Sequence, residues 1–220
     1  MHLYSGEQQR TYFPAPFSAV LWPLQGHIGS GKKPVTVIGI DGRSGGGKTS
    51  FANTLAAKLD ATLLNTDDFA WWHSMFDWPE LLIENALKPL LAGQDVSFRP
   101  PAWVERGREG AIVAASNPVI IVEGVGASQE AMRLYLDYNI WVQSDAIVAK
   151  ERGLIRDAAE RPDPAEAERF WNEWQQAEDE FQAAQQSWLQ ASFTICGTPS
   201  ALPNPGADAP YDAGQLWLGR

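Results

Sequence analysis

Short apolar runs, rich in β-branched residues, recur along the chain and predict buried strands. Their apolar character is continuous rather than alternating, which is typical of a parallel sheet covered on both faces. The predicted strands lie within residues 34–40, 61–69, 118–127, 139–144 and 192–196.

Apolar residues between these runs return at helical spacing. In residues 49–59, Phe51, Leu55 and Leu59 fall on one face of a helix. Further helices are predicted over residues 78–94, 145–161 and 163–190. Pro89 is expected to kink or divide the first of these three, because proline has no N–H to donate. Strands that alternate with helices predict an α/β fold with a parallel sheet flanked by helices.

The regular pattern is confined to the middle of the chain. Residues 1–34 contain scattered Pro, Gly and aromatic residues without a clear period, and we interpret them as an N-terminal extension. Residues 35–197 form the predicted domain, in which residues 98–110 are irregular. Residues 198–220 are rich in Pro, Gly and Ala and are expected to form a loop or a loosely docked tail.

Composition narrows the choice of partners and compartment. The chain has 220 residues and a formal net charge of −10, which argues against nucleic acid and anionic membranes as partners. Its single cysteine, Cys196, cannot form an internal disulfide. No apolar run has membrane-spanning length, and no secretory signal is visible. We expect a cytoplasmic protein, present as a monomer or a homodimer.

The stretch GRSGGGKT, residues 42–49, lies between a predicted strand and a predicted helix. It fits the pattern G-x-x-x-x-G-K-[ST] in full, which predicts binding of ATP or GTP with Mg²⁺. Glycines let backbone N–H groups face the phosphates, and the helix adds the positive end of its dipole. The nucleotide-binding residues are predicted to be Gly42, Arg43, Ser44, Gly45, Gly46, Gly47, Lys48, Thr49 and Ser50. Lys48 is expected to reach the β- and γ-phosphates, and the Thr49 hydroxyl is expected to reach Mg²⁺.

Acidic residues follow two of the predicted strands. Asp67 and Asp68 come after the second strand, and Glu123 lies at the end of the third. Ligands of an open parallel sheet collect beyond the carboxyl ends of its strands, so these acids are expected to converge on the phosphate-binding turn. A carboxylate there holds Mg²⁺ or accepts a proton from an attacking hydroxyl. The alternative for any one of them is an Asx turn or a helix cap.

Four stretches together carry a family resemblance: GIDGRSGGGKTSFANTLAAKL, TDDF, VEGVGA and RDAAER. They resemble the uridine kinase-like branch of P-loop kinases, which includes relatives of uridine kinase, phosphoribulokinase and pantothenate kinase. The resemblance covers about residues 35–196. It implies a three-layer P-loop fold with a five-stranded parallel sheet and a helical lid that bears arginines, and it implies ATP as the phosphoryl donor.

The resemblance also implies roles for single residues. The family's Asp-x-Phe element supplies the general base, which places the base at Asp67, with Asp68 as the neighbouring alternative. Glu123 matches a glutamate that holds Mg²⁺ through water, so the implied metal site comprises Thr49, Asp67 and Glu123. The implied lid arginines are Arg152, Arg156 and Arg161, with Arg152 and Arg156 in catalytic roles beside Lys48 and with Arg156 also contacting ATP. The alternative is that these arginines form surface pairs with Glu151, Asp157 or Glu160.

The acceptor region departs from the family pattern. Where the family often carries Tyr-Asp-Trp or Tyr-Asp-Tyr, this chain reads Pro101-Ala102-Trp103, so uridine specificity is not supported. An aromatic segment, FAWWHSMFDWPE, is present instead. Candidate substrate residues are Asp68, Phe69, Trp72, Asp77, Trp103 and Arg108. Trp71 and Trp78 are further stacking candidates, and packing between helices is the alternative for all of these aromatic side chains.

Taken together, these expectations predict an enzyme. We predict an ATP-dependent phosphotransferase that moves the γ-phosphoryl group to a hydroxyl of a small molecule, nucleoside-like or another metabolite. One alternative is an ATPase or nucleotide-dependent switch that acts with a protein partner. The other is a nucleoside monophosphate kinase, whose acceptor is a phosphate and which needs no general base.

Overall fold

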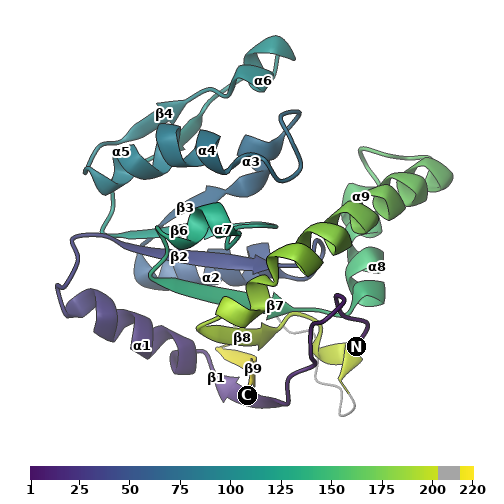
Figure 1. Ribbon diagram of the computed structural model, residues 1–220, viewed down its shortest axis with the longest axis horizontal. Helices are drawn as coiled ribbons and strands as arrows, with labels where there is room; N and C mark the ends of the chain where they lie inside the picture. The colour runs from purple at the N-terminus through teal and green to yellow at the C-terminus, as the bar shows by residue number, and fades with distance from the viewer. Residues whose placement is uncertain (203–213) are drawn as a thin grey trace.

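The computed structural model describes residues 1–202 and 214–220, and its centre is a parallel sheet (Figure 1). The five parallel strands are β2 (Thr36–Gly42), β3 (Thr62–Asn65), β6 (Val119–Glu123), β7 (Tyr138–Gln143) and β8 (Phe193–Cys196). All seven residues of β2 are buried, as expected for a central strand. The predicted α/β fold and its five strands are confirmed.

Two strands from the ends of the described chain extend this sheet beyond the five that were expected. They are β1 (Tyr12–Pro16) and β9 (Gln215–Gly219), and the full order is β1-β9-β8-β7-β2-β6-β3. Both added strands run antiparallel to their neighbours. Two prolines in β1 weaken its strand pattern in the sequence, and an edge strand tolerates them because its outer N–H groups need no partner.

The segment expected to be an N-terminal extension therefore supplies part of the core. Ala15 of β1 pairs with Leu216 of β9, and both side chains are buried. The segment also forms α1 (Ser18–Gly29), whose Val20 and Leu24 are fully buried. Of the tail predicted over residues 198–220, residues 203–213 lie outside the described part, and residues 215–219 form β9.

Helices cover both faces of the sheet, which gives three layers. On one face of the sheet, Ile38 and Ile40 of β2 pack against α1 and α2 (Lys48–Leu59), and Phe51 is the contributing side chain of α2. The other face packs Val37, Ile120 and further residues against the segment between β3 and β6. Figure 1 shows α7 (Glu130–Arg133) and α9 (Pro164–Gln185) in front of the sheet, with α8 (Ala146–Asp157) beside α9.

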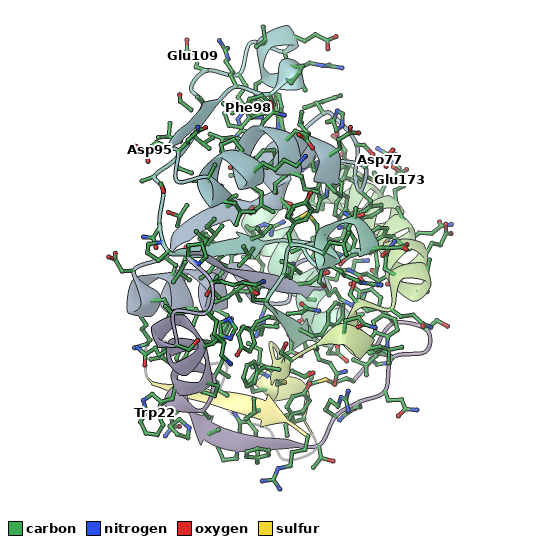
Figure 2. The ribbon with its side chains drawn as sticks, turned by 60° about the vertical axis from the view of Figure 1, so that its left-hand side comes forward. Trp22, Asp77, Asp95, Phe98, Glu109 and Glu173 are labelled. Carbon is green, nitrogen blue, oxygen red and sulfur yellow. The ribbon has the colours of Figure 1, made fainter. Side chains whose placement is uncertain are left out.

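The segment between β3 and β6 contains most of the short elements. They are α3 (Thr66–Ala70), α4 (Pro79–Leu82), the π-helix η1 (Ile83–Leu87), α5 (Lys88–Leu91), β4 (Val96–Phe98), α6 (Pro101–Glu105) and β5 (Ile112–Ala114). Strands β4 and β5 form an antiparallel hairpin. Figure 2 places Glu109, between α6 and β5, at the opposite end of the molecule from Trp22 of α1.

Several predicted boundaries shift for local reasons. The helix predicted over 78–94 spans residues 79–91 and widens into η1 before Pro89, which has no N–H to donate to the preceding turn. The helix predicted over 163–190 ends at Gln185, because Gln186 has a left-handed backbone conformation. The 3-10 helices η2 (Ser187–Gln190) and η3 (Pro199–Ala201) flank β8. No helix of the described residues has both the length and the apolar character needed to cross a bilayer.

Candidate active site

A cavity of about 1370 Å³ lies at the carboxyl ends of the parallel strands. Its walls come from the turn after β2, the residues after β3, the end of β6, the end of β8 and the helices α8 and α9. This is the edge at which ligands of open α/β sheets bind. The sequence motifs therefore meet in one place, as expected.

Gly42 and Gly45 show why the phosphate-binding turn is rich in glycine. Gly42 has a φ of 144°, and a Cβ there would lie 2.4 Å from the carbonyl oxygen of Val142. Gly45 has a φ of 71°, and a Cβ there would lie 2.1 Å from the carbonyl oxygen of Ala149. Side chains at these positions would push the turn away from β7 and α8, so glycine lets the turn lie close to the lid helix.

Lys48 and Thr49 begin α2 at the floor of the cavity. The Lys48 ammonium is buried and donates to the carbonyl oxygen of Arg43 at 3.0 Å. The Thr49 hydroxyl donates to Oε1 of Glu123 at 3.2 Å. Both side chains line the cavity, so the cation and the hydroxyl are within one site.

Glu123, at the end of β6, is only 2% exposed. Burial raises the pKa of its carboxyl group and the charge of Asp67 raises it further, whereas Lys48 and the Thr49 hydrogen bond oppose the shift. Its second oxygen, Oε2, is buried and has no hydrogen-bond partner among the described residues. An unpaired carboxylate oxygen beside a hydroxyl fits a Mg²⁺ site, in which Mg²⁺ takes few protein ligands and also binds phosphate oxygens.

The same described residues contain no group of three or more His, Cys, Asp or Glu side chains that could hold a metal by themselves.

The two neighbouring aspartates after β3 point in different directions. They lie in the first turn of α3 rather than on the strand, and Asn65 caps this helix by accepting from the Asp67 N–H. Asp67 is exposed and lines the cavity. Asp68 instead accepts from Nη2 of Arg108 at 2.8 Å and is not among the described lining residues. The structure thus separates the two candidates for the base.

Three arginines of the lid line the cavity: Arg152, Arg156 and Arg161. Nη1 of Arg152 donates to the carbonyl oxygen of Gly197 at 2.7 Å. Arg156 pairs with Asp157, and this hydrogen bond raises the pKa of Arg156, to which the charge of Asp67 also contributes. These arginines therefore face the cavity and also contact neighbouring groups of the protein.

Arg161 lies over the ring of Phe170 at 3.7 Å, and its nearest carboxylate oxygen, on Glu160, is 4.0 Å away. Its guanidinium is therefore held mainly by an aromatic face.

Arg43 and Ser44, two residues of the phosphate-binding turn, contact helix α9. Arg43 is 3% exposed and pairs with Asp179 of α9 at 2.8 Å, so its side chain lies away from the described cavity wall. The Ser44 N–H donates to Oε1 of Glu178 at 2.8 Å. The motif predicted nucleotide contacts over its whole length, whereas the side chain of Arg43 is packed against the protein.

Aromatic side chains form a second part of the cavity wall, beside the phosphate-binding turn. Trp72 lines the cavity, as do Trp71 of the same segment and three residues of α9: Phe170, Trp171 and Trp174. The sequence analysis assigned no site role to the aromatic residues of α9 and so missed this part of the wall. The signal was present in the spacing of Phe170 and Trp174, four residues apart on one face.

Several other predicted substrate residues lie outside this wall. Asp68, Phe69, Asp77, Trp103 and Arg108 are not among the described lining residues. Phe69 and Trp78 are fully buried in the core. Arg108 lies 3.5 Å over the ring of Trp103, whose Nε1 donates to the carbonyl oxygen of Asp68. These contacts tie α6 to α3.

Asp41 is a structural residue of the site that the motif analysis did not single out. It is fully buried in β2. Its carboxylate accepts from the N–H groups of Gly42 and Gly126, from Ser128 and from Nε2 of Gln182. It therefore joins the start of the phosphate-binding turn to the loop after β6 and to α9.

Comparisons with known proteins place this chain in a family. No protein-family model matches the chain. The uridine kinase of Staphylococcus haemolyticus is 32% identical over 146 residues, which cover 57% of this chain and 70% of that protein. The uridine kinase of Staphylococcus aureus is 32% identical over 149 residues, which cover 59% of this chain and 72% of that protein.

A solved structure of a possible uridine kinase from Bacillus stearothermophilus has the same fold, with a TM-score of 0.50 and 18% sequence identity. The match covers 78% of this chain and 98% of that structure. The sequence relatives, the fold and the convergence of the motifs on one cavity agree. The chain belongs to the uridine kinase-like family of P-loop kinases and is an ATP-dependent small-molecule kinase.

Proposed function

We propose that this enzyme transfers the γ-phosphoryl group of ATP to a hydroxyl of a small molecule with a flat or apolar face. The observation that carries the proposal is the position of Asp67, which lines the same cavity as Lys48, Glu123 and the tryptophan wall. Asp67 shares this cavity with Thr49 and Glu123 of the expected metal site and with Arg156 of the lid.

In the proposed reaction Asp67 accepts the proton of the acceptor hydroxyl. The acceptor oxygen forms a bond to the γ-phosphorus as the bond from that phosphorus to the β–γ bridging oxygen breaks, and ADP leaves. Lys48 and the lid arginines neutralise the charge on the transferring group. Thr49 and Glu123 would hold Mg²⁺, which would supply further neutralisation of the phosphate charge.

The acceptor half of the cavity supports a hydroxylated molecule with a stacking face. Trp71, Trp72, Trp171 and Trp174 supply aromatic surface, and His73 and Ser74 supply polar groups among them. Nucleosides have this shape, and the relatives with 32% identity are uridine kinases. Gly197, Pro199 and Trp217 also line the cavity, and we assign the base of ATP to their side of it.

The test combines an acceptor screen with two matched variants. ADP formation is measured with nucleosides, sugar alcohols and pantothenate-like alcohols, and we expect it to depend on one acceptor class. Asp67→Asn should lower kcat by about 10²–10⁴-fold, the range of general-base catalysis, and leave ATP affinity unchanged. Asp68→Asn is the control, since it loses a partly exposed ion pair with Arg108 that contributes little.

Three results would count against the proposal. Acceptor-independent ATP hydrolysis at the full rate would favour the ATPase alternative. Phosphorylation of nucleoside monophosphates alone would favour the second alternative. Loss of kcat in Asp68→Asn but not in Asp67→Asn would reject Asp67 as the base.

A further inference from the structure

The first ten residues pack against the elements that surround the site rather than lining the cavity itself. We call residues 1–10 the N-terminal strap. Figure 1 shows the N-terminus next to α8, from which the chain runs to β1 at the sheet edge. The His2 N–H donates to Oδ2 of Asp145 at 2.6 Å, and the His2 carbonyl accepts from the N–H of Ala146 at 3.0 Å. Since Asp145 caps α8, the strap is attached to the start of a lid helix.

The middle of the strap is fixed to the central sheet. Glu7 accepts from Nε1 of Trp141 at 2.6 Å and from Nε2 of Gln143 at 2.7 Å, both on β7. The Arg10 N–H donates to the Gln143 side chain at 3.0 Å. With both ends held, the residues between His2 and Glu7 have little freedom to move away.

Tyr4 is the strap residue that reaches the phosphate-binding turn. It is 4% exposed and its ring stacks on Trp188. Its hydroxyl donates to Oε1 of Glu178 at 2.6 Å, the same oxygen that accepts from the Ser44 N–H at 2.8 Å. Burial raises the pKa of the Tyr4 phenol, so it stays protonated and continues to donate.

The Tyr4 ring also fixes the neighbouring residue of the turn. The Arg43 guanidinium lies 3.8 Å from the centre of this ring and pairs with Asp179 on its other side. Nε1 of Trp174, part of the aromatic cavity wall, donates to Oγ of Ser44 at 2.8 Å and to Oε2 of Glu178 at 3.0 Å. One cluster thus joins the strap, the turn and the lid helix α9.

We propose that the N-terminal strap is a positioning element of the nucleotide site, with Tyr4 as its principal residue. Tyr4 holds the Glu178 carboxylate against Ser44 and keeps Arg43 turned into the protein. The backbone N–H groups that follow Ser44 are thereby kept in place for phosphate before ATP arrives. None of these side chains needs to touch the reacting atoms, so the effect reaches ATP through the backbone of the turn.

The experiment measures direct binding of Mg²⁺·ATP by calorimetry, without acceptor. It rests on the proposed function only in taking ATP as the donor. Tyr4→Phe removes the hydroxyl and keeps the ring. The matched control is Tyr12→Phe, which removes a similar hydrogen bond from the Tyr12 hydroxyl to Gln143 at 2.9 Å, away from the turn. We expect about a tenfold higher Kd for ATP in Tyr4→Phe, the loss of one hydrogen bond to a charged group.

Three readouts separate positioning from simple stability. Tyr12→Phe should keep the wild-type Kd even if its Tm falls as far as that of Tyr4→Phe. The KM for the acceptor should stay unchanged in both variants. Glu178→Gln should raise the Kd as well, and the double variant with Tyr4→Phe should bind ATP no more weakly than the weaker single variant, because both changes disrupt one cluster.

Equal Kd values for wild type, Tyr4→Phe and Tyr12→Phe would overturn the inference and leave the proposed phosphotransferase intact. A Kd that rises equally in the two tyrosine variants would also overturn it, because the cause would then be general loosening of the strap. Wild-type protein that fails to bind ATP would overturn the phosphotransferase proposal and this inference together.

Discussion

Two carboxylates line the same cavity as Lys48, and they differ in burial. Asp67 is exposed, whereas Glu123 is enclosed by β6 and its neighbours and keeps one oxygen unpaired among the described residues. Burial penalises the charged form of Glu123, so the folded protein binds a proton there more tightly than the unfolded chain does. The charged Glu123 carboxylate therefore lowers the stability of the folded protein when no cation is bound to it.

The burial of Glu123 predicts that its effect on the stability of the protein depends on pH. Between the ordinary glutamate pKa and the raised pKa of Glu123, the folded state binds more protons than the unfolded state, so the contribution of Glu123 to stability falls as pH rises. Metal-free Glu123→Gln should therefore gain Tm relative to wild type as pH rises through this window, with a constant difference above it. Thermal unfolding from pH 4.5 to 8 measures this.

The same variant should lose activity, because an amide is a poor ligand for Mg²⁺. We expect kcat to fall by about 10²-fold, within the several kcal/mol that metal assistance supplies. A difference in Tm that shrinks with rising pH, or wild-type kcat in Glu123→Gln, would contradict this account of Glu123.

At the scale of elements, the lid depends on the close approach of α8 and α9. Gly153 of α8 is buried against the ring of Trp171 from α9, and a Cβ on Gly153 would lie 1.9–2.0 Å from two atoms of that ring. A glycine in the middle of a helix costs stability, and here that cost lets a cavity-lining tryptophan sit between the two helices. The contact lies on the same helix as the lid arginines Arg152 and Arg156.

Gly153→Ala should therefore destabilise the protein by about 1–3 kcal/mol, the usual effect of overpacking, and should raise the KM for ATP. The control is Gly26→Ala in α1, where a Cβ would meet no atom of the described chain within 4 Å. That change should be neutral or stabilising by up to about 1 kcal/mol, since alanine is the better helix former. Urea unfolding measures the stability of both variants. Equal stability of Gly153→Ala and Gly26→Ala would contradict a close contact between Gly153 and Trp171.

The elements differ in how readily sequence alone predicts them. The five parallel strands were predictable because each contains a short apolar run, even edge strand β3, in which only Leu64 is buried. Strands β1 and β9 were not, because β1 contains prolines and each finds its partner at the far end of the sequence, beyond the reach of local pattern.

The candidate site divides in the same way. The motif predicted the turn, and the strand order brought Asp67 and Glu123 to it. The inward direction of Arg43 depends on Tyr4 and Asp179, which are distant in sequence and carry no local signal.

At the scale of the whole molecule, the two added strands belong to the same folding unit as the kinase core. Leu216 of β9 is 2% exposed and packs with Phe51 of α2 and Ile195 of β8 in one cluster. The contact joins the end of the described chain to the helix that follows the phosphate-binding turn. Stability should therefore respond to β9 as it does to any core strand.

Leu216→Ala should destabilise the protein by about 2–4 kcal/mol, the cost of a cavity in a packed core. Leu189→Ala is the matched control, because Leu189 in η2 is 61% exposed; its effect should stay within about 0.5 kcal/mol. Denaturant unfolding followed by fluorescence gives both values. A Leu216→Ala variant as stable as Leu189→Ala would mean that β9 contributes little to the fold.

The pairing of β1 with β9 also has a consequence for biosynthesis. Antiparallel contacts join residues 12–16 to residues 215–219, so a ribosome must translate almost the whole chain before β1 meets its partner. Domains begin to fold during synthesis, and the parallel core can assemble while β1 is still unpaired. The outer strands therefore complete the sheet last, and an interrupted chain carries an unpaired N-terminal strand that is open to other chains or to chaperones.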